Sequence, residues 1–375
     1  MLITLVAGAR PNFMKIAPII HAIKKAKNNG VAISYRLIHT GQHYDKKMSG
    51  DFFEQLNIPV PDTNLECGGG TQAEQTAAIM VKFEKELMNN RPNLVIVVGD
   101  VTSTMACTIT AKKLCIDVAH VEAGIRSGDM TMPEEINRIV TDSICDYFFT
   151  TSQYANELLL KQQVDKNKIY FVGNTMIDTL YHNLERTIPP TFWNQYQLSE
   201  KNYFLLTLHR PSNVDQPEKL TQLLSEITLA TSDYPIIFPV HPRTKQIIDK
   251  LNIKHERLIM IDPQPYLEFI YLVQHAKAII TDSGGITEEA TVLQIPCITL
   301  RNSTERPETI TMGTNELIGD DMGKMHQCIQ TILQNKWKKG SIPPLWDGNT
   351  ANRIIDAIQK IYTPTTALKQ PITAS

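Results

Sequence analysis

The sequence lacks the features of membrane-spanning and secreted chains. No apolar run approaches the length of about eighteen residues that a membrane-spanning helix needs. The apolar residues 1–9 have no basic leader before them, and Arg10 ends them at once, so we read them as a first buried strand rather than a signal peptide. The six cysteines are scattered, with no Cys-x-x-Cys spacing, which is typical of thiols in a reducing compartment. We therefore expect a cytoplasmic protein without a membrane partner.

An excess of charge of one sign and metal-binding patterns are also missing. Lys and Arg number 37 and Asp and Glu number 39, which leaves a formal net charge of -2. This balance gives no reason to expect nucleic acid as a partner. The ten histidines include no His-Glu-x-x-His, and no Cys or His cluster has the spacing of zinc ligands. No metal is expected, and any anion must be bound by a few placed basic groups.

The first half of the sequence alternates short apolar runs with longer amphipathic ones. The apolar runs predict strands, and the amphipathic stretches, such as 11–27, 71–89, 103–114 and 134–145, predict helices. Because the runs are apolar almost throughout, both faces of their sheet should be covered, as in a parallel, doubly wound sheet. The predicted strands are residues 2–8, 33–40, 93–99, 118–123, 147–151 and 168–173.

The alternation stops around residues 187–201, which include Pro189-Pro190, and then restarts. Further strands are predicted at 203–209, 236–241, 258–261, 278–281 and 297–300. Two such units predict an α/β protein with two Rossmann-like domains facing each other across a cleft. We place the first domain at residues 1–172 and the second at 173–348. A helix at 349–362 is expected to pack back on the first domain, followed by a frayed tail at 363–375.

A glycine-rich turn follows the predicted strand 278–281, at the end where parallel sheets bind ligands. The turn Ser283-Gly284-Gly285 opens a helix and lets backbone N–H groups approach a phosphate closely. Glu289, one turn further, is placed to bind the hydroxyls of a ribose. The alternative is an ordinary helix start, with Ser283 as the N-cap and acidic residues in the first turn.

A second anion site is predicted where the first strand ends. Gly8-Ala9-Arg10-Pro11-Asn12 leads into a helix that carries Lys15, so an arginine, a lysine and backbone N–H groups gather at one helix start. The alternative is an ordinary turn with solvated basic residues. The stretch is not Gly-x-Gly-x-x-Gly, so it carries no nicotinamide or flavin fingerprint.

Carboxylates recur at strand ends in the first half, and histidines in the second. Asp100, Glu122 and the pair Glu134-Glu135 suggest acid–base chemistry if they converge on one sheet edge. Asp100 has a simpler alternative as a helix cap, and Glu134 as a first-turn acid paired with Arg138. Glu122 ends an apolar strand, where a charge is costly unless it is partnered. His209-Arg210 and His241-Pro242-Arg243 lie at two adjacent strand ends, which suits a site that handles phosphate and protons.

Taken together and in order, these motifs resemble the non-hydrolysing UDP-N-acetylglucosamine 2-epimerases over nearly the whole chain. Few of the motifs mean much alone, but their order and spacing are specific. The matching pieces are Gly8-Ala9-Arg10-Pro11 with Lys15, Gly99-Asp100, His120–Arg126, Pro133–Arg138, Gly173-Asn174-Thr175, His209-Arg210, Pro239-Val240-His241, Asp282–Ala290, Thr304–Glu308 and Gly313-Thr314-Asn315.

The resemblance implies the GT-B architecture and a reversible inversion at C2 of UDP-N-acetylglucosamine (UDP-GlcNAc) that gives UDP-N-acetylmannosamine (UDP-ManNAc). It implies elimination of UDP to a 2-acetamidoglucal and re-addition on the other face, with no metal or redox cofactor. A UDP-sugar substrate, a homodimer and a role in surface polysaccharide synthesis are expected with it. The motif positions imply catalytic roles for Asp100, Glu122, Glu134 and His209, and UDP-binding roles for Arg10, Lys15, His241, Ser283, Gly284, Gly285, Glu289 and Arg306.

The sequence departs from the family pattern at two places. Ser212 stands where family members commonly have a glutamate after the His-Arg motif. The stretches near Gln42-His43-Tyr44 and Gly70-Thr71-Gln72 lack the arginines that many bacterial members use to bind activating UDP-GlcNAc. Three alternatives stay open: a hydrolysing epimerase that releases free sugar, an epimerase for a modified sugar such as a diacetamido uronic acid, and a GT-B glycosyltransferase.

Overall fold

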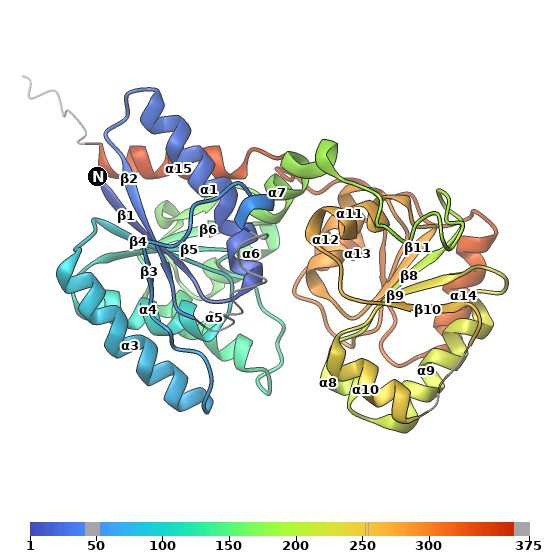
Figure 1. The fold of residues 1–375 in the computed structure, drawn as a ribbon. Helices are drawn as coiled ribbons and strands as arrows, with labels where there is room; N and C mark the ends of the chain where they lie inside the picture. The colour runs from blue at the N-terminus through green and yellow to red at the C-terminus, as the bar shows by residue number, and fades with distance from the viewer. Residues whose placement is uncertain (42–52, 252, 254, 364–375) are drawn as a thin grey trace, which may run out of the picture.

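The computed structural model describes residues 1–41, 53–251, 253 and 255–363. Two lobes stand side by side, and each is a parallel sheet with helices around it (Figure 1). The strand order is β3-β2-β1-β4-β5-β6-β7 in the first lobe and β10-β9-β8-β11-β12-β13 in the second. The predicted α/β class with two Rossmann-like units in the GT-B arrangement is confirmed.

The first lobe matches the predicted strands and helices to within about two residues at each end. Its strands are β1 (Leu2–Ala7), β2 (Ser34–His39), β3 (Thr63–Asn64), β4 (Leu94–Val98), β5 (Asp117–Val121), β6 (Tyr147–Thr150) and β7 (Ile169–Phe171). Its helices are α1 (Arg10–Asn28), α3 (Gln72–Asn89), α4 (Thr102–Lys113), α5 (Pro133–Ile144) and α6 (Gln153–Lys161), with a 3-10 turn η1 (Lys166–Lys168). Strand β3 was not predicted because it is two polar residues long.

The second lobe repeats the same alternation. Its strands are β8 (Phe204–Thr207), β9 (Ile236–Pro239), β10 (Leu258–Ile261), β11 (Ala278–Thr281), β12 (Cys297–Thr299) and β13 (Asn315–Leu317). Its helices are α8 (Pro211–Val214), α9 (Pro217–Ala230), α10 (Pro242–Lys250), α11 (Tyr266–His275), α12 (Gly284–Val292), α13 (Pro307–Thr311) and α14 (Met322–Leu333). Strand β13 was not predicted because its Asn-Glu-Leu sequence has no apolar run.

The chain crosses between the lobes twice. The first crossing runs through α7 (Thr175–Asn183) and η2 (Leu184–Arg186), and the second leads into α15 (Thr350–Tyr362), which lies along α1 (Figure 1). Ile354, Ile355 and Ile358 of α15 are buried in the core of the first lobe. Asp178 joins the crossings, because its carboxylate accepts from the backbone N–H groups of Thr350 at 3.0 Å and Ala351 at 2.7 Å.

Gly173 at the first crossing is required by close packing. An added Cβ there would lie 2.2 Å from the carbonyl oxygen of Leu345 in the second crossing, and the φ of Gly173 is +102°. A side chain would therefore push the two connecting segments apart. In the residues that the structure describes, no helix is long and apolar enough to cross a membrane. All six cysteines are unpaired, and five of them are buried.

Candidate functional site

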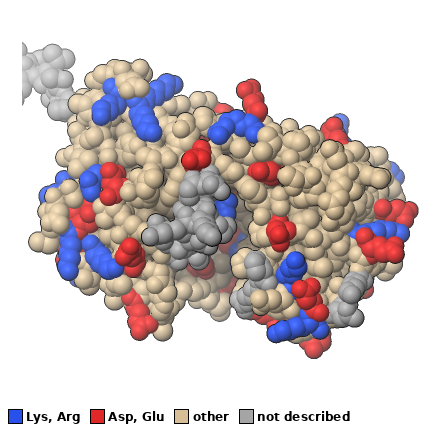
Figure 2. Space-filling view, in the orientation of Figure 1, with Lys and Arg blue, Asp and Glu red and all other residues tan. Residues whose placement is uncertain are grey.

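A cavity of about 620 Å³ lies between the lobes, at the carboxyl ends of strands from both sheets. Figure 2 shows the molecule hollowed between its two halves. Ten of the twelve residues assigned from the sequence line this cavity: Lys15, Asp100, Glu122, Glu134, His209, Ser283, Gly284, Gly285, Glu289 and Arg306.

Arg10 and His241 are not among the described residues that line the cavity. Arg10 is the first residue of α1 and is exposed, and His241 follows β9 and is also exposed. At the start of α1 the backbone N–H groups of Gly8 and Ala9 donate to the side chain of Asn12, at 3.1 and 2.9 Å. The proposed UDP-binding roles of Arg10 and His241 therefore stay predictions from the sequence.

Glu122 is buried where the two lobes meet. It is the first residue after β5, and its backbone has a φ of +71°, which is unusual for a residue other than glycine. Lys15 of α1 donates to the Glu122 carboxylate at 2.6 Å. Arg306 of the second lobe lies 3.3 Å from the same carboxylate. Burial alone would raise the pKa of Glu122, but the two cations outweigh it and hold the pKa below its ordinary value. The costly charge that ends this strand is thus partnered on both sides.

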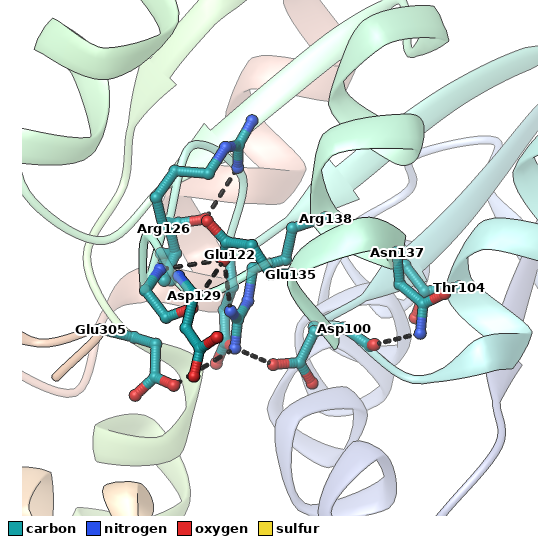
Figure 3. A network of polar contacts seen from close by, with 12 residues as sticks. Asp100, Thr104, Glu122, Arg126, Asp129, Glu135, Asn137, Arg138 and Glu305 are labelled. Atoms are coloured by element: carbon teal, nitrogen blue, oxygen red, sulfur yellow. Dashed lines mark hydrogen bonds and ion pairs between the residues drawn. The ribbon is translucent and has the colours of Figure 1, made fainter. Parts of the chain in front are cut away.

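Arg138 links Asp100 in the first lobe to Glu305 in the second. The Arg138 guanidinium pairs with Asp100, donates to Glu135 at 2.8 Å and lies 3.6 Å from Glu305 of the second lobe. Figure 3 shows this guanidinium between Asp100 and Glu305. Asp100 is not the cap of α4, because the N-cap is Val101, without a side-chain hydrogen bond. The helix-cap alternative for Asp100 is therefore wrong.

Glu134 and Glu135 are separated by the turn of α5. Glu134 lines the cavity, whereas Glu135 is buried away from it and accepts from the N–H groups of Ser127 at 2.9 Å and Gly128 at 3.0 Å. Arg138 pairs with Glu135 at i+3 and not with Glu134 at i+4, so the simple pairing expected for Glu134 is also wrong. Glu135 fixes the loop before α5, and Glu134 is left facing the cavity.

The glycine turn of the second lobe opens toward the cavity. Ser283 is the N-cap of α12, but its side chain makes no capping hydrogen bond. An added Cβ at Gly285 would meet no atom within 4 Å, and one at Gly284 would lie 3.5 Å from the guanidinium of Arg301. The backbone N–H groups of a first helical turn have no partners within the helix, so this turn offers donors to an anion in the cavity.

Two adjacent acids of α12 have different partners. Glu288 pairs with Arg306, and Glu289 accepts a hydrogen bond at 3.3 Å from the hydroxyl of Tyr266, which also lines the cavity. Burial and the neighbouring Glu288 raise the pKa of Glu289 to about 8. Tyr266 could not be predicted from the sequence, because one tyrosine at the start of an apolar helix carries no signal.

His209 projects into the cavity from the end of β8. Its Nδ1 lies 2.7 Å from the carboxylate of Asp282, and the side chain is 56% exposed. Asp282 is buried and also accepts from the N–H groups of His209 at 3.1 Å and Arg210 at 3.0 Å. Burial raises the pKa of Asp282, but its hydrogen bonds, that of His209 first, hold it below the ordinary value. An ionised Asp282 fixes Nδ1 as the donor, which leaves Nε2 to exchange protons in the cavity.

The departures from the family pattern lie outside the cavity or outside the described residues. Ser212 is exposed and does not line the cavity, although its neighbour Pro211 does. The stretch Gln42-His43-Tyr44 is not among the described residues. Thr71 caps α3 by accepting from the N–H of Glu74 at 3.2 Å. Within the described ranges, no group of three or more His, Cys, Asp or Glu side chains could hold a metal ion.

Comparison with known proteins gives one family. The model of the UDP-N-acetylglucosamine 2-epimerases matches residues 24–359. The UDP-N-acetylglucosamine 2-epimerase of Methanocaldococcus jannaschii is 41% identical over 95% of this chain and 98% of its own length. The UDP-2,3-diacetamido-2,3-dideoxy-D-glucuronate 2-epimerase of Pseudomonas aeruginosa is 39% identical over 89% of this chain and 92% of its own.

The solved structures agree with the sequence relatives. The crystal structure of the M. jannaschii enzyme in complex with UDP-GlcNAc and UDP superposes with a TM-score of 0.85. The superposition covers 96% of this chain and 100% of that one, at 40% sequence identity. The M. jannaschii enzyme is therefore similar to this chain in both sequence and fold.

Proposed function

Because this chain belongs to the UDP-N-acetylglucosamine 2-epimerase family, we propose that it interconverts UDP-GlcNAc and UDP-ManNAc without hydrolysing them. One observation carries the proposal: a single cavity has carboxylates of the first lobe on one side and a glycine turn with an arginine on the other. The first set suits proton transfer at a sugar carbon, and the second suits a diphosphate.

The second lobe would hold the nucleotide. The turn at Ser283–Gly285 offers backbone donors to the diphosphate, and Nη1 of Arg306 is buried without a hydrogen-bond partner among the described residues. An arginine with an unused donor beside a helix start is a suitable binder of phosphate oxygens. Glu289 is placed one turn further to bind the ribose hydroxyls, and Lys15 would approach the diphosphate from the first lobe.

The chemistry would proceed by elimination and re-addition. A carboxylate takes the proton from C2, the C–H electron pair forms the C1–C2 double bond, and the C1–O pair leaves with UDP. UDP then adds back to C1 while an acid delivers a proton to the opposite face of C2. The charge that builds on the leaving UDP would be stabilised by Arg306, Lys15 and the backbone donors.

Asp100, Glu122 and Glu134 are the candidates for these proton transfers, with His209 beside them. The three acids come from separate elements of the first lobe and His209 comes from the second, so groups on different sides of a bound sugar ring can act in turn. Closure of the cavity around the substrate would exclude water, which otherwise traps the glycal intermediate or releases free sugar. The product would be a precursor for surface polysaccharide.

One experiment separates this proposal from its alternatives. The protein is incubated with UDP-GlcNAc in D2O, and the sugar is followed by proton NMR. Formation of UDP-ManNAc with deuterium at C2 is expected. Free ManNAc would indicate a hydrolysing enzyme instead. If UDP-GlcNAc is unchanged, a parallel incubation with UDP-2,3-diacetamido-2,3-dideoxy-D-glucuronate tests the modified-sugar alternative that the P. aeruginosa relative brings.

A further inference from the structure

His120 is buried between two acceptors beneath the proposed acids. It lies in β5, two residues before Glu122, and is 0% exposed. Its Nδ1 lies 2.6 Å from the carboxylate of Asp142 in α5, and its Nε2 lies 2.8 Å from the carbonyl oxygen of Gly99. The cavity lining does not include His120 or Asp142, so neither can touch the substrate.

The hydrogen-bond partners determine where the protons of this pair lie. A carbonyl oxygen only accepts, so Nε2 carries a proton. Asp142 accepts from Arg126 at 2.7 Å and from the N–H of Gly124 at 3.0 Å. Burial raises the pKa of Asp142, but His120 and Arg126 outweigh it and hold the pKa below its ordinary value. Because the Arg126 guanidinium and the Gly124 N–H hold Asp142 as a carboxylate, the 2.6 Å contact is a hydrogen bond donated by Nδ1, so both ring nitrogens of His120 carry a proton.

The pair also holds the backbone on which two of the acids sit. Asp142 bonds to His120 on one side of Glu122 and to Gly124 on the other, so one carboxylate brackets the segment with the unusual +71° φ. Such a backbone conformation is unfavourable for a residue other than glycine and persists only when its surroundings hold it. Through Nε2, the same pair fixes the carbonyl of Gly99, the residue directly before Asp100.

We infer that Asp142 and His120 are positioning residues for the proposed epimerisation: they fix Asp100 and Glu122 relative to Glu134 of α5 and keep a positive charge beneath Glu122. The other titratable groups that face the pair are Arg126, Glu122 and the thiol of Cys145, which lies near Asp142. The catalytic part of this inference rests on the proposed function. The charge on His120 is independent of it.

Asp142→Asn tests the catalytic part. The asparagine keeps an acceptor for Gly124, and its amide N–H then faces Nδ1 and makes the imidazole neutral. We expect kcat to fall about 10- to 100-fold, the effect of a small misplacement of catalytic groups, with KM and UDP affinity nearly unchanged. The acidic limb of the pH–kcat profile should move to higher pH, because Glu122 loses a nearby cation.

A double variant separates hydrogen bonding from charge. In His120→Gln with Asp142→Asn, the asparagine amide can donate to the glutamine, and the glutamine amide to Gly99. We expect this variant to regain part of kcat while its acidic limb stays displaced. Glu226→Gln is the matched control, since it removes the carboxylate 2.8 Å from His326 on the surface of the second lobe and should change nothing. Wild-type kcat and an unmoved pH profile in folded Asp142→Asn would overturn the inference.

The charge on His120 is measured directly by NMR of protein labelled with 15N-histidine. Both ring nitrogens should be protonated in the folded protein, and His120→Gln identifies the signal. A neutral tautomer at about pH 7 would overturn the inference while leaving the proposed function intact. A wild-type chain that epimerises no UDP-sugar would instead overturn the proposed function and the positioning role with it.

Discussion

Arg306 of the second lobe lies 3.3 Å from the carboxylate of Glu122 in the first, and the same guanidinium pairs with Glu288. A proposed phosphate-binding group is thus in contact with a proposed catalytic acid in this structure. A diphosphate that binds Arg306 must compete with Glu122 for it. Nucleotide binding and the availability of Glu122 are therefore coupled in the proposed mechanism.

UDP alone should bind without a divalent metal and raise the melting temperature. Arg306→Lys keeps a positive charge but loses the two-pronged geometry, so the Kd for UDP should rise at least about tenfold. Calorimetric titration in EDTA measures binding without metal and the change in Kd, and melting curves with and without UDP measure the stabilisation. Arg257→Lys, which changes a partly exposed arginine that pairs with Asp233 away from the cavity, is the control. Absence of UDP binding by the wild type in EDTA, or an unchanged Kd in Arg306→Lys, would contradict this.

Neutral replacement of the three acids should reduce turnover. Asp100→Asn, Glu122→Gln and Glu134→Gln should each lower kcat at least about a hundredfold, the usual effect of removing an acid–base group. UDP affinity should change little in Asp100→Asn and Glu134→Gln, because the nucleotide is bound mainly by the second lobe, whereas Glu122→Gln should bind UDP more tightly because its carboxylate no longer competes for Arg306. Asp129→Asn, in the loop before α5, serves as the control. Full activity in any two of the three variants would rule out the catalytic assignment.

The stability of the folded chain should fall as the pH rises, because of Glu289. Its pKa of about 8 lies above the ordinary 4.5, so the folded chain binds an extra proton between these values. The contribution to stability is complete below about pH 4.5 and is lost as the pH rises through 8. Glu289→Gln stays neutral, so it should melt close to the wild type at about pH 5 and at least about 2 °C higher at about pH 8.5. An equal difference in melting temperature between Glu289→Gln and the wild type at both pH values would exclude this account.

Ligand binding should close the cleft further. Contacts of one diphosphate with Lys15 in the first lobe and with Ser283 and Arg306 in the second favour the closed arrangement of the lobes. Small-angle scattering with saturating UDP should show a smaller radius of gyration than the free protein. The same titration with Arg306→Lys, at UDP concentrations that saturate it, shows whether this contact matters. An unchanged radius of gyration in the wild type would favour a rigid, preformed cleft.

The fold was largely predictable because buried parallel strands leave a strong signal. Runs such as Leu94–Val98 are apolar throughout, and their helices have clear amphipathic spacing. The two strands that were missed, at Thr63–Asn64 and Asn315–Leu317, are short, polar segments that pair only because a neighbouring strand is already in place. Such strands form because a neighbouring strand offers hydrogen-bond partners, and their own sequence does not predict them.

The sequence predicted most of the residues that line the cavity, but not which of them form ion pairs and hydrogen bonds with one another. Strand-end position brought ten residues to one cavity, whereas Arg10 and His241 share the same kind of position and lie outside its lining. The alternatives for Asp100 and Glu134 considered only neighbours along one helix. The contact of Arg138 with Glu305 joins residues far apart in the sequence, which local spacing cannot indicate.

By itself, the sequence determined the two parallel-sheet units and the residue types at their strand ends, because burial and backbone hydrogen bonding impose local patterns. Only the tertiary structure decided which charges meet. Arg306 reaches Glu122 across the lobes, Asp142 holds His120 between two elements, and Glu289 is buried beside Glu288. The protonation of each group depends on these distances and on exclusion of water, and both arise when the lobes pack together.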